Sequence, residues 1–331
     1  MLRFIKHAVP DPKANNWIAL TYLIPEHWSL REQLYWVLED VTSPVRFFCQ
    51  LSRPDGLQSY EAFPIYRSSY SHNPNLGTSG YPPPNTVVDG LQWIVSQVRS
   101  NVYYTITKVG VLPGATKQQH QGYDTHSTTT SVSGYVRIEY KQGNITFEEE
   151  FCGTFNSVTT LMGSSYSPYT SISWGLYDMY AYKAIKGQLE DARKIGMSIT
   201  HSFRTDPHWF EYYMQVVQIG VQGFYQNLEA QRRLSNTILQ HNREISAATQ
   251  AAFNERMASQ DRINEQFRDV LGGVERYYDP KNHSEVQLPL GYSNAWVNAK
   301  GDTYILSEVA GYSPNQNVQL ATEGWQQIQK K

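Results

Sequence analysis

The chain has 331 residues, a formal net charge of −2 and only 18% charged residues, beside 24 tyrosines, 12 phenylalanines and 8 tryptophans. A near-neutral chain lacks the basic field that attracts nucleic acid, so we expect no nucleic-acid partner. No apolar run reaches the length of a membrane span or of a signal peptide, so we expect no membrane insertion. A cytoplasmic protein is the expectation, with leaderless secretion as the alternative.

The two cysteines, Cys49 and Cys152, both lie in apolar runs of strand-like composition. Two cysteines are too few to stabilise a chain of this length by disulfides, so we expect both to be buried and reduced. A disulfide between them is the alternative, because the two strands that carry them can be neighbours.

The first part of the chain is predicted to form strands. Residues 17–24 and 45–52 are rich in apolar and aromatic side chains, as strands are. Pro54, Asp55 and Gly56 form a turn signal, because proline presets φ and glycine accepts a positive φ. Residues 58–66 then return as a third strand, which completes a hairpin.

A helix is predicted over residues 86–98, where apolar side chains fall three and four residues apart and share one face. They are Val87, Leu91, Ile94 and Val98, and Thr86 or Asn85 can cap the helix. Residues 67–85, rich in serine, glycine and proline, are predicted to be a loop. With Tyr66, Tyr70, Tyr81 and the segment 164–170, this region predicts a Tyr-rich binding surface. Ordinary loops that cover a sheet are the alternative.

Four more strands are predicted over residues 102–112, 134–141, 144–152 and 171–182. A tight turn at residues 141–144 joins the middle two, and residues 113–133 are predicted to be a polar loop. Residues 188–203 form a second helix. This order of elements predicts an α+β fold for residues 1–205, an antiparallel sheet sandwich with covering helices.

One long, nearly unbroken helix is predicted from Pro207 to Leu271. Asp206 precedes it as a cap, Pro207 takes the first helical position, and Gly272 and Gly273 end it. About 65 residues at about 1.5 Å each would span on the order of 100 Å. A helix of that length is predicted to be coiled-coil-like and built for association rather than for chemistry.

The apolar spacing of this helix predicts an oligomer seam. Its members are Phe210, Met214, Val217, Val221, Phe224, Leu228, Phe253, Met257, Ile263, Phe267 and Val270. The first six step by four and three residues, as in a heptad repeat, so we expect a homo-oligomer. Alternatively, the first stretch packs on the chain's own sheet and the second pairs between chains. Residues 206–274 are therefore predicted to be a helical oligomerisation or packing segment.

The last part, residues 275–331, is predicted to be a small C-terminal β module. Its strands alternate with turns, and aromatic side chains, chiefly Trp296 and Tyr304, are expected to hold it together and to contribute to interaction.

Motifs in this tail carry a resemblance. The tail carries in succession Leu288-Pro289, Gly291-Tyr292, Ala295-Trp296, Asn298, Gly301 and Tyr304-Ile305-Leu306-Ser307. The motif at the helix entry is Ser202-Phe203-Arg204, Pro207 and Trp209-Phe210. These motifs are similar to those of a group of bacterial proteins with the tail LPxGYxxAWxNxxGxYILS, an N-terminal α/β region and a long Gln- and Asn-rich helix. In element order the N-terminal half also resembles PsbP-like α/β/α sandwiches. That resemblance implies partner binding and no known activity.

Residues with chemistry are few, and none is predicted to bind a cofactor or a metal. Glu149 shares a strand face with Phe147 and Phe151, where a buried carboxyl could act as an acid; the alternative is a solvated side chain or an ion pair, for example with Arg137. His201 and His208 flank the helix entry and form either an acid–base cluster or helix-end contacts. His120 and His126 lie in a polar segment that offers no rigid set of metal ligands. Phosphate-loop, dinucleotide, nucleophile-elbow and zinc motifs are absent from the sequence.

The sequence therefore predicts a non-enzymatic scaffold or interaction protein that self-assembles through its helix and presents a Tyr-rich surface. A hydrolase-type enzyme with a site in the sandwich, and a secreted effector or export-associated protein, are the alternatives.

Overall fold

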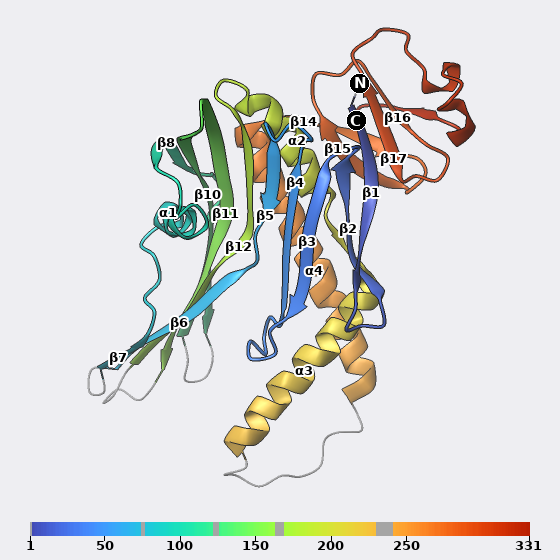
Figure 1. The fold of residues 1–331 in the computed structure, drawn as a ribbon. Helices are drawn as coiled ribbons and strands as arrows, with labels where there is room; N and C mark the ends of the chain where they lie inside the picture. The colour runs from blue at the N-terminus through green and yellow to red at the C-terminus, as the bar shows by residue number, and fades with distance from the viewer. Residues whose placement is uncertain (1, 74–76, 122–125, 163–168, 230–240) are drawn as a thin grey trace.

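The computed structural model describes residues 2–73, 77–121, 126–162, 169–229 and 241–331 (Figure 1). The chain is mainly β, with 50% of its residues in strands and 23% in helices. The predicted α+β class with one long helix is therefore wrong. Two antiparallel sheets and a small β-hairpin form most of the fold, and four α-helices pack on them within the described residues.

The larger sheet has ten antiparallel strands, of which the three central ones are long. Its order is β3-β4-β5-β12-β11-β10-β8, with β6 beside β12, β7 beside β6, and β9 beside β10. The strands are β3 (Ser29–Trp36), β4 (Val45–Ser52), β5 (Ser59–Ala62), β6 (Tyr66–Asn73), β7 (Gly77–Gly80), β8 (Tyr104–Val111), β9 (Thr116–Gln121), β10 (His126–Gln142), β11 (Ile145–Met162) and β12 (Tyr169–Ile185).

The smaller sheet joins the two ends of the chain. Its order is β13-β2-β1-β17-β16-β18, with β1 (Leu2–Asp11), β2 (Trp17–Pro25), β13 (Arg204–Thr205), β16 (Asn294–Val297), β17 (Thr303–Ser307) and β18 (Gln326–Ile328). Because Leu2 pairs with Leu306, the termini lie side by side (Figure 1). The segments 1–205 and 275–331 thus share one sheet. A separate hairpin, β14 (Val274–Asp279) and β15 (Ser284–Pro289), and two short 3-10 helices (Pro314–Gln316 and Ala321–Glu323) complete the tail.

Helix α1 (Val87–Val98) confirms the predicted helix and its cap. The Thr86 hydroxyl accepts a hydrogen bond from the backbone N–H of Asp89, and the Asp89 carboxylate accepts one from the N–H of Thr86. This capping box satisfies two donors at the helix start. The apolar face of α1 packs on β10 and β11, where Gly134 and Gly153 lack the side chains that would hold the helix off the sheet.

Helix α2 (Leu189–Ser202) lies between the two sheets and confirms the second predicted helix. It contacts β12 of the larger sheet, β2 of the smaller sheet, and β15. The main core therefore spans both sheets and includes Phe4, Tyr22, Tyr60, Tyr182, Phe267 and Tyr277. Burial of these large side chains accounts for much of the stabilisation of the two sheets against each other.

Two helices, not one, follow α2. The chain forms α3 (Pro207–Glu229) and α4 (His241–Leu271), and residues 230–240 lie outside the described part. The Phe210 ring in α3 lies 5.3 Å from the Phe253 ring in α4. Along one continuous helix these residues would stand about 65 Å apart, at about 1.5 Å per residue. The chain therefore folds back, and both predicted ends hold: Asp206 caps α3, and Gly272 and Gly273, with positive φ, follow α4.

Several predicted loops are strands. Residues 67–85 contain most of β6 and all of β7, and residues 113–133 contain β9 and the first half of β10. These segments are rich in serine and threonine and are held by pairing with β12 and β11. Strands β1 and β3 were also not predicted. The hairpin turn at residues 141–144 is confirmed, with Gly143 at φ 61°.

Candidate functional site

A cavity of about 530 Å³ lies between one face of the larger sheet and helices α3 and α4. Strands β4, β5 and β12 form its floor, and side chains of α3, α4 and the end of α2 form the opposite wall. Aromatic rings dominate the apolar part of the wall: Phe47, Tyr60, Phe63, Phe203, Trp209 and Tyr213. A cavity of this size and mixed lining is typical of sites that take drug-sized molecules.

The buried carboxylate of Asp11 fixes α3 over this cavity. Its Oδ2 accepts hydrogen bonds from the indole N–H groups of Trp36, at 2.9 Å, and Trp209, at 2.8 Å. Trp209 stacks on Tyr213 one turn further along the helix. A buried carboxylate is stable only when such donors satisfy it, so Asp11 holds β1, β3 and α3 in one arrangement.

The floor of the cavity contains a β-bulge at Asp178. The register of β11 and β12 shifts between Cys152 and Thr154, which leaves one extra residue on β12. Asp178 sits there with φ 49°, a left-handed conformation that is uncommon outside glycine, asparagine and aspartate. As a result the consecutive residues Tyr177 and Asp178 both line the cavity.

The Asp178 carboxyl has no hydrogen-bond or ion-pair partner among the described residues. Asp178 is solvent-exposed and faces the space of the cavity. Desolvation by the surrounding protein raises the pKa of Asp178 above its ordinary value, and the positive charge of Arg256 on α4 opposes the shift. An unpaired carboxyl with a raised pKa in a cavity is a candidate functional group.

Arg256 enters the cavity from the opposite wall. Within the described part of the chain no carboxylate lies within ion-pair distance of its guanidinium, whose closest recorded partner is the Phe210 ring, 5.9 Å from the guanidinium carbon. Arg67, a second cation of the lining, is held by Asp40 at 3.2 Å and by the Thr42 hydroxyl. The buried Oδ1 of Asn156 also lines the cavity and has no hydrogen-bond partner.

The described lining residues include several groups that can bind a ligand. Asp178 is the one carboxylate among them, and they include no histidine, cysteine or lysine. A nucleophile needs a neighbouring base, and general acid–base catalysis needs a second titratable group within reach. The arrangement suits recognition of a molecule with polar and apolar parts.

Glu149, the predicted acid candidate, lies outside this cavity in a buried ion pair. Its side chain faces α1, on the same side of β11 as Phe147 and Phe151, as the alternation predicts. Arg99 donates to it through Nε at 3.0 Å and also pairs with Glu61 at 3.0 Å. Burial raises the pKa of Glu149, and Arg99 opposes that shift. The predicted partner Arg137 pairs with Glu150 instead.

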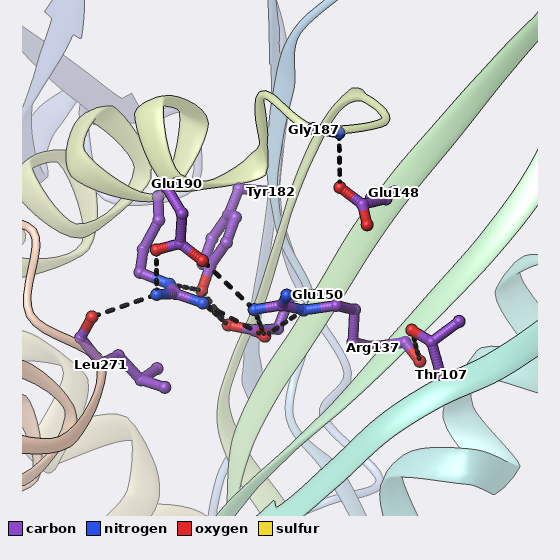
Figure 2. A network of polar contacts seen from close by, with 9 residues as sticks. Thr107, Arg137, Glu148, Glu150, Tyr182, Gly187, Glu190 and Leu271 are labelled. Atoms are coloured by element: carbon purple, nitrogen blue, oxygen red, sulfur yellow. Dashed lines mark hydrogen bonds and ion pairs between the residues drawn. The ribbon is translucent and has the colours of Figure 1, made fainter.

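Glu150 forms a second buried network on the other face of the same strand (Figure 2). Arg137 donates to it at 2.9 Å, Tyr182 donates a short hydrogen bond, and Arg193 lies 3.2 Å away. Arg193 also donates to the backbone carbonyl of Leu271 at 3.2 Å, which anchors the last turn of α4. Every charge in this network is paired, so its role is structural.

The two histidines at the helix entry occupy different surroundings. His201 is buried, and burial with the nearby cations Arg268 and Arg204 lowers its pKa to about 3. His208 is exposed and packs on the Trp17 ring at 4.1 Å. The structure therefore does not bring them together as an acid–base pair. The side chains of His120 and His126 lie outside the described residues, and no group of three potential metal ligands gathers in the part that is described.

The predicted seam residues divide into three groups. Phe210, Met214, Val217 and Phe253 pack in one cluster with Trp209, while Ile263 and Phe267 belong to the main core, where Phe267 is 0% exposed. Val221 and Met257 are half-buried, and the side chains of Phe224, Leu228 and Val270 lie outside the described set. Much of the seam thus packs within one chain.

The predicted interaction residues of the tail are also largely covered. Tyr304 is buried and bonds to Asp279, and Trp296 is half-buried on β16. Tyr66 packs against Trp93 and Trp174, whereas Tyr81 is exposed. Residues 164–168 lie outside the described part. Cys49 and Cys152 are buried and unpaired, as predicted.

Sequence reasoning missed Asp178 and Arg256, although one signal was present. Asp178 interrupts an otherwise apolar and aromatic run, Trp174 to Tyr182, within a central strand. A charged residue in the middle of a buried strand is unusual and marks either an ion pair or a site.

Comparison with known proteins adds no assignment. No family model matches the chain, and no curated protein matches it. The likeness to the bacterial group with the LPxGYxxAWxNxxGxYILS tail therefore stays a prediction. No helix in the described residues is long and apolar enough to cross a membrane.

Proposed function

We propose that this protein is a non-enzymatic binding protein that takes a small molecule into the cavity under α3 and α4. The observation that carries the proposal is the unpaired carboxyl of Asp178 in a cavity of about 530 Å³. A left-handed backbone at a residue other than glycine lowers stability, and proteins keep such residues mainly at functional sites. The exposed carboxyl of Asp178 is at the same time accessible to a ligand in the cavity.

The described lining residues include one carboxylate and no histidine, cysteine or lysine, which favours binding over hydrolysis. The aromatic side chains supply apolar contact, and the polar groups of Asp178, Arg256 and Asn156 supply orientation. This proposal keeps the interaction role expected from the sequence and places it in the cavity.

A thermal-shift screen of the full chain against a small-molecule library tests the proposal. Ser259→Trp places a large side chain in the cavity, while Ala258→Trp places the same side chain on the exposed face of the same helix. Compounds that raise the melting temperature of the wild type should lose their effect in Ser259→Trp and keep it in Ala258→Trp. Equal effects in both variants would contradict binding in this cavity.

Self-association is a second proposal, supported by one surface feature. Ile219 on α3 is a large aliphatic side chain that is 68% exposed, and it offers apolar surface that a second copy of the chain could cover. Light scattering at micromolar concentration should show an oligomer that Ile219→Glu dissociates. A monomeric wild type would rule this out.

A cytoplasmic place of action belongs to the same proposal. Two buried, unpaired cysteines suit a reducing compartment. Fractionation of the source cells with antibody against the protein should recover it in the cytoplasm; recovery from the medium without lysis would favour the secreted alternative.

A further inference from the structure

Asp178 and Arg256 line the same cavity from opposite walls. Asp178 belongs to β12 in the floor, and Arg256 belongs to α4. The two charges influence each other, yet they form no ion pair among the contacts of the described residues. Both residues are exposed, so each charge is accessible to a ligand that enters the cavity between them.

A ligand with a single charge can pair with only one of these two charged side chains. A simple carboxylate would meet Arg256 but would leave Asp178 unpaired beside a second negative charge. A simple amine would meet Asp178 and face Arg256 with a like charge. Like charges at close range in a partly enclosed site are costly, because the surrounding protein screens them less than water does. A ligand that carries both charges avoids each penalty.

The other residues that line the cavity indicate the chemistry of the uncharged part of that ligand. Phe203, Trp209 and Tyr213 form an aromatic wall, and the volume of about 530 Å³ exceeds what two charged groups alone would fill. An apolar, preferably aromatic, body would gain contact area there. The buried, unpartnered Oδ1 of Asn156 can accept one further hydrogen bond from a polar N–H of the ligand.

We infer that the cavity binds an apolar amino acid or short apolar peptide, with its ammonium group on Asp178 and its carboxylate on Arg256. Both charged ends then make charge-assisted hydrogen bonds, and the apolar side chains rest on the aromatic wall. The inference rests on the proposed function and specifies the chemistry of its ligand. Binding would also tie α4 to β12, since the ligand spans the two walls.

Isothermal titration of the full chain with a dipeptide of two phenylalanines tests this. The comparison ligands are the N-acetylated dipeptide, which lacks the ammonium, and the C-terminal amide, which lacks the carboxylate. The wild type should bind the free dipeptide roughly tenfold or more tightly than either blocked form, the usual effect of one charge-assisted hydrogen bond.

Two variants assign each end of the ligand to a wall. Asp178→Asn should bind the free and N-acetylated dipeptides alike, because it lacks the negative charge that pairs with the ammonium group. It should still prefer the free dipeptide to the C-terminal amide. Asparagine also tolerates the left-handed backbone, so the variant keeps the local conformation. Arg256→Gln should show the reverse pattern. Asp261→Asn and Arg262→Gln remove the same charges from exposed positions of α4 that do not line the cavity, and should keep both preferences.

Equal binding of free and blocked dipeptides by the wild type would overturn the inference, as would preferences that survive in both variants. In either case library compounds whose effect Ser259→Trp abolishes would leave the proposed function standing. If no compound and no dipeptide binds in the cavity, the proposed function fails together with the inference.

Discussion

The ring of Phe210, in the first turn of α3, lies 5.3 Å from the ring of Phe253 in α4. This contact joins α3 and α4 within one chain. Phe210, Met214 and Val217, three of the residues with heptad spacing, therefore find partners in the same molecule, and side chains of both helices line one wall of the cavity. A repeat pattern predicts that a helix face will be buried, but it does not predict in which chain the covering surface lies.

Loss of either ring should destabilise the chain, and the loss in stability should be smaller when the other ring is already absent. Phe210→Ala should cost about 3 kcal/mol in free energy of unfolding, since the side chain is buried, and Phe253→Ala somewhat less. The double variant should lose less than the sum, by roughly 0.5–1.5 kcal/mol, as expected for an aromatic pair. Urea unfolding at pH 7 measures all three; strict additivity would contradict the contact.

The bulge at Asp178 predicts a conflict between stability and binding. Asp178→Gly should raise the free energy of unfolding by up to about 1 kcal/mol, because glycine adopts the left-handed conformation without strain. The same variant should bind the free dipeptide less tightly. Asp178→Ala removes the carboxyl but keeps the strain, so it serves as the control; equal stability of the glycine and alanine variants would show that the backbone is not strained.

Acidification should weaken dipeptide binding before most exposed carboxylates titrate. Desolvation by the surrounding protein raises the pKa of Asp178, so this carboxyl becomes protonated at a higher pH than an ordinary aspartate and then no longer pairs with an ammonium group. Affinity should be constant well above the raised pKa and should fall as the pH drops through it. Titrations from pH 7.5 to 4.5 measure the effect, which Asp178→Asn should abolish.

His201 should make the fold sensitive to acid. Its pKa is lowered to about 3 in the folded chain, from an ordinary value of 6.5, chiefly by burial. Below about pH 6.5 the unfolded chain therefore takes up a proton that the folded chain does not, and stability falls by up to about 1.4 kcal/mol per pH unit. His201→Gln should show a shallower fall between pH 6.5 and 5. His27→Gln, at a side chain that is 82% exposed, should behave as the wild type.

The Arg99–Glu149 pair should prove structural. Arg99→Met leaves Glu149 buried without its cation and should cost about 3–5 kcal/mol, and a second change, Glu149→Gln, should recover part of that loss. Arg53→Met breaks the exposed pair with Asp55 and should cost no more than about 1 kcal/mol. Chemical unfolding of Arg99→Met, of the double variant, of Glu149→Gln alone and of Arg53→Met measures these losses. If Glu149→Gln alone leaves stability intact, an active role for Glu149 is favoured instead.

Local signals explain the elements that the sequence predicts well. The capping pair Thr86 and Asp89 and the glycine turn at Gly143 act within a few residues, so their outcome is readable without the rest of the chain. The ends of α3 and α4 follow for the same reason from Asp206 and Gly272. Glu149 was also placed on the correct face, because strand alternation is local.

The elements that were missed depend on distant partners. Strand β6 has few apolar residues, and its seven paired positions lie on β12, about 100 residues further along the chain. The first half of β10 is a run of serine and threonine that resembles a loop until β11 pairs with it. The site was hidden for the same reason, because Asp178 and Arg256 line one cavity only when α4 folds back over the larger sheet.

The pairing of β1 with β17 has a consequence for biosynthesis. Leu2 and Leu306 are joined across roughly 300 residues, so β1 is made long before the strand that covers one of its edges. Until Thr303–Ser307 has left the ribosome, that edge offers unpaired backbone donors and acceptors to any neighbouring chain. Completion of the smaller sheet is thus a late, largely post-translational step, and a nascent chain stalled before residue 303 should need a chaperone or aggregate.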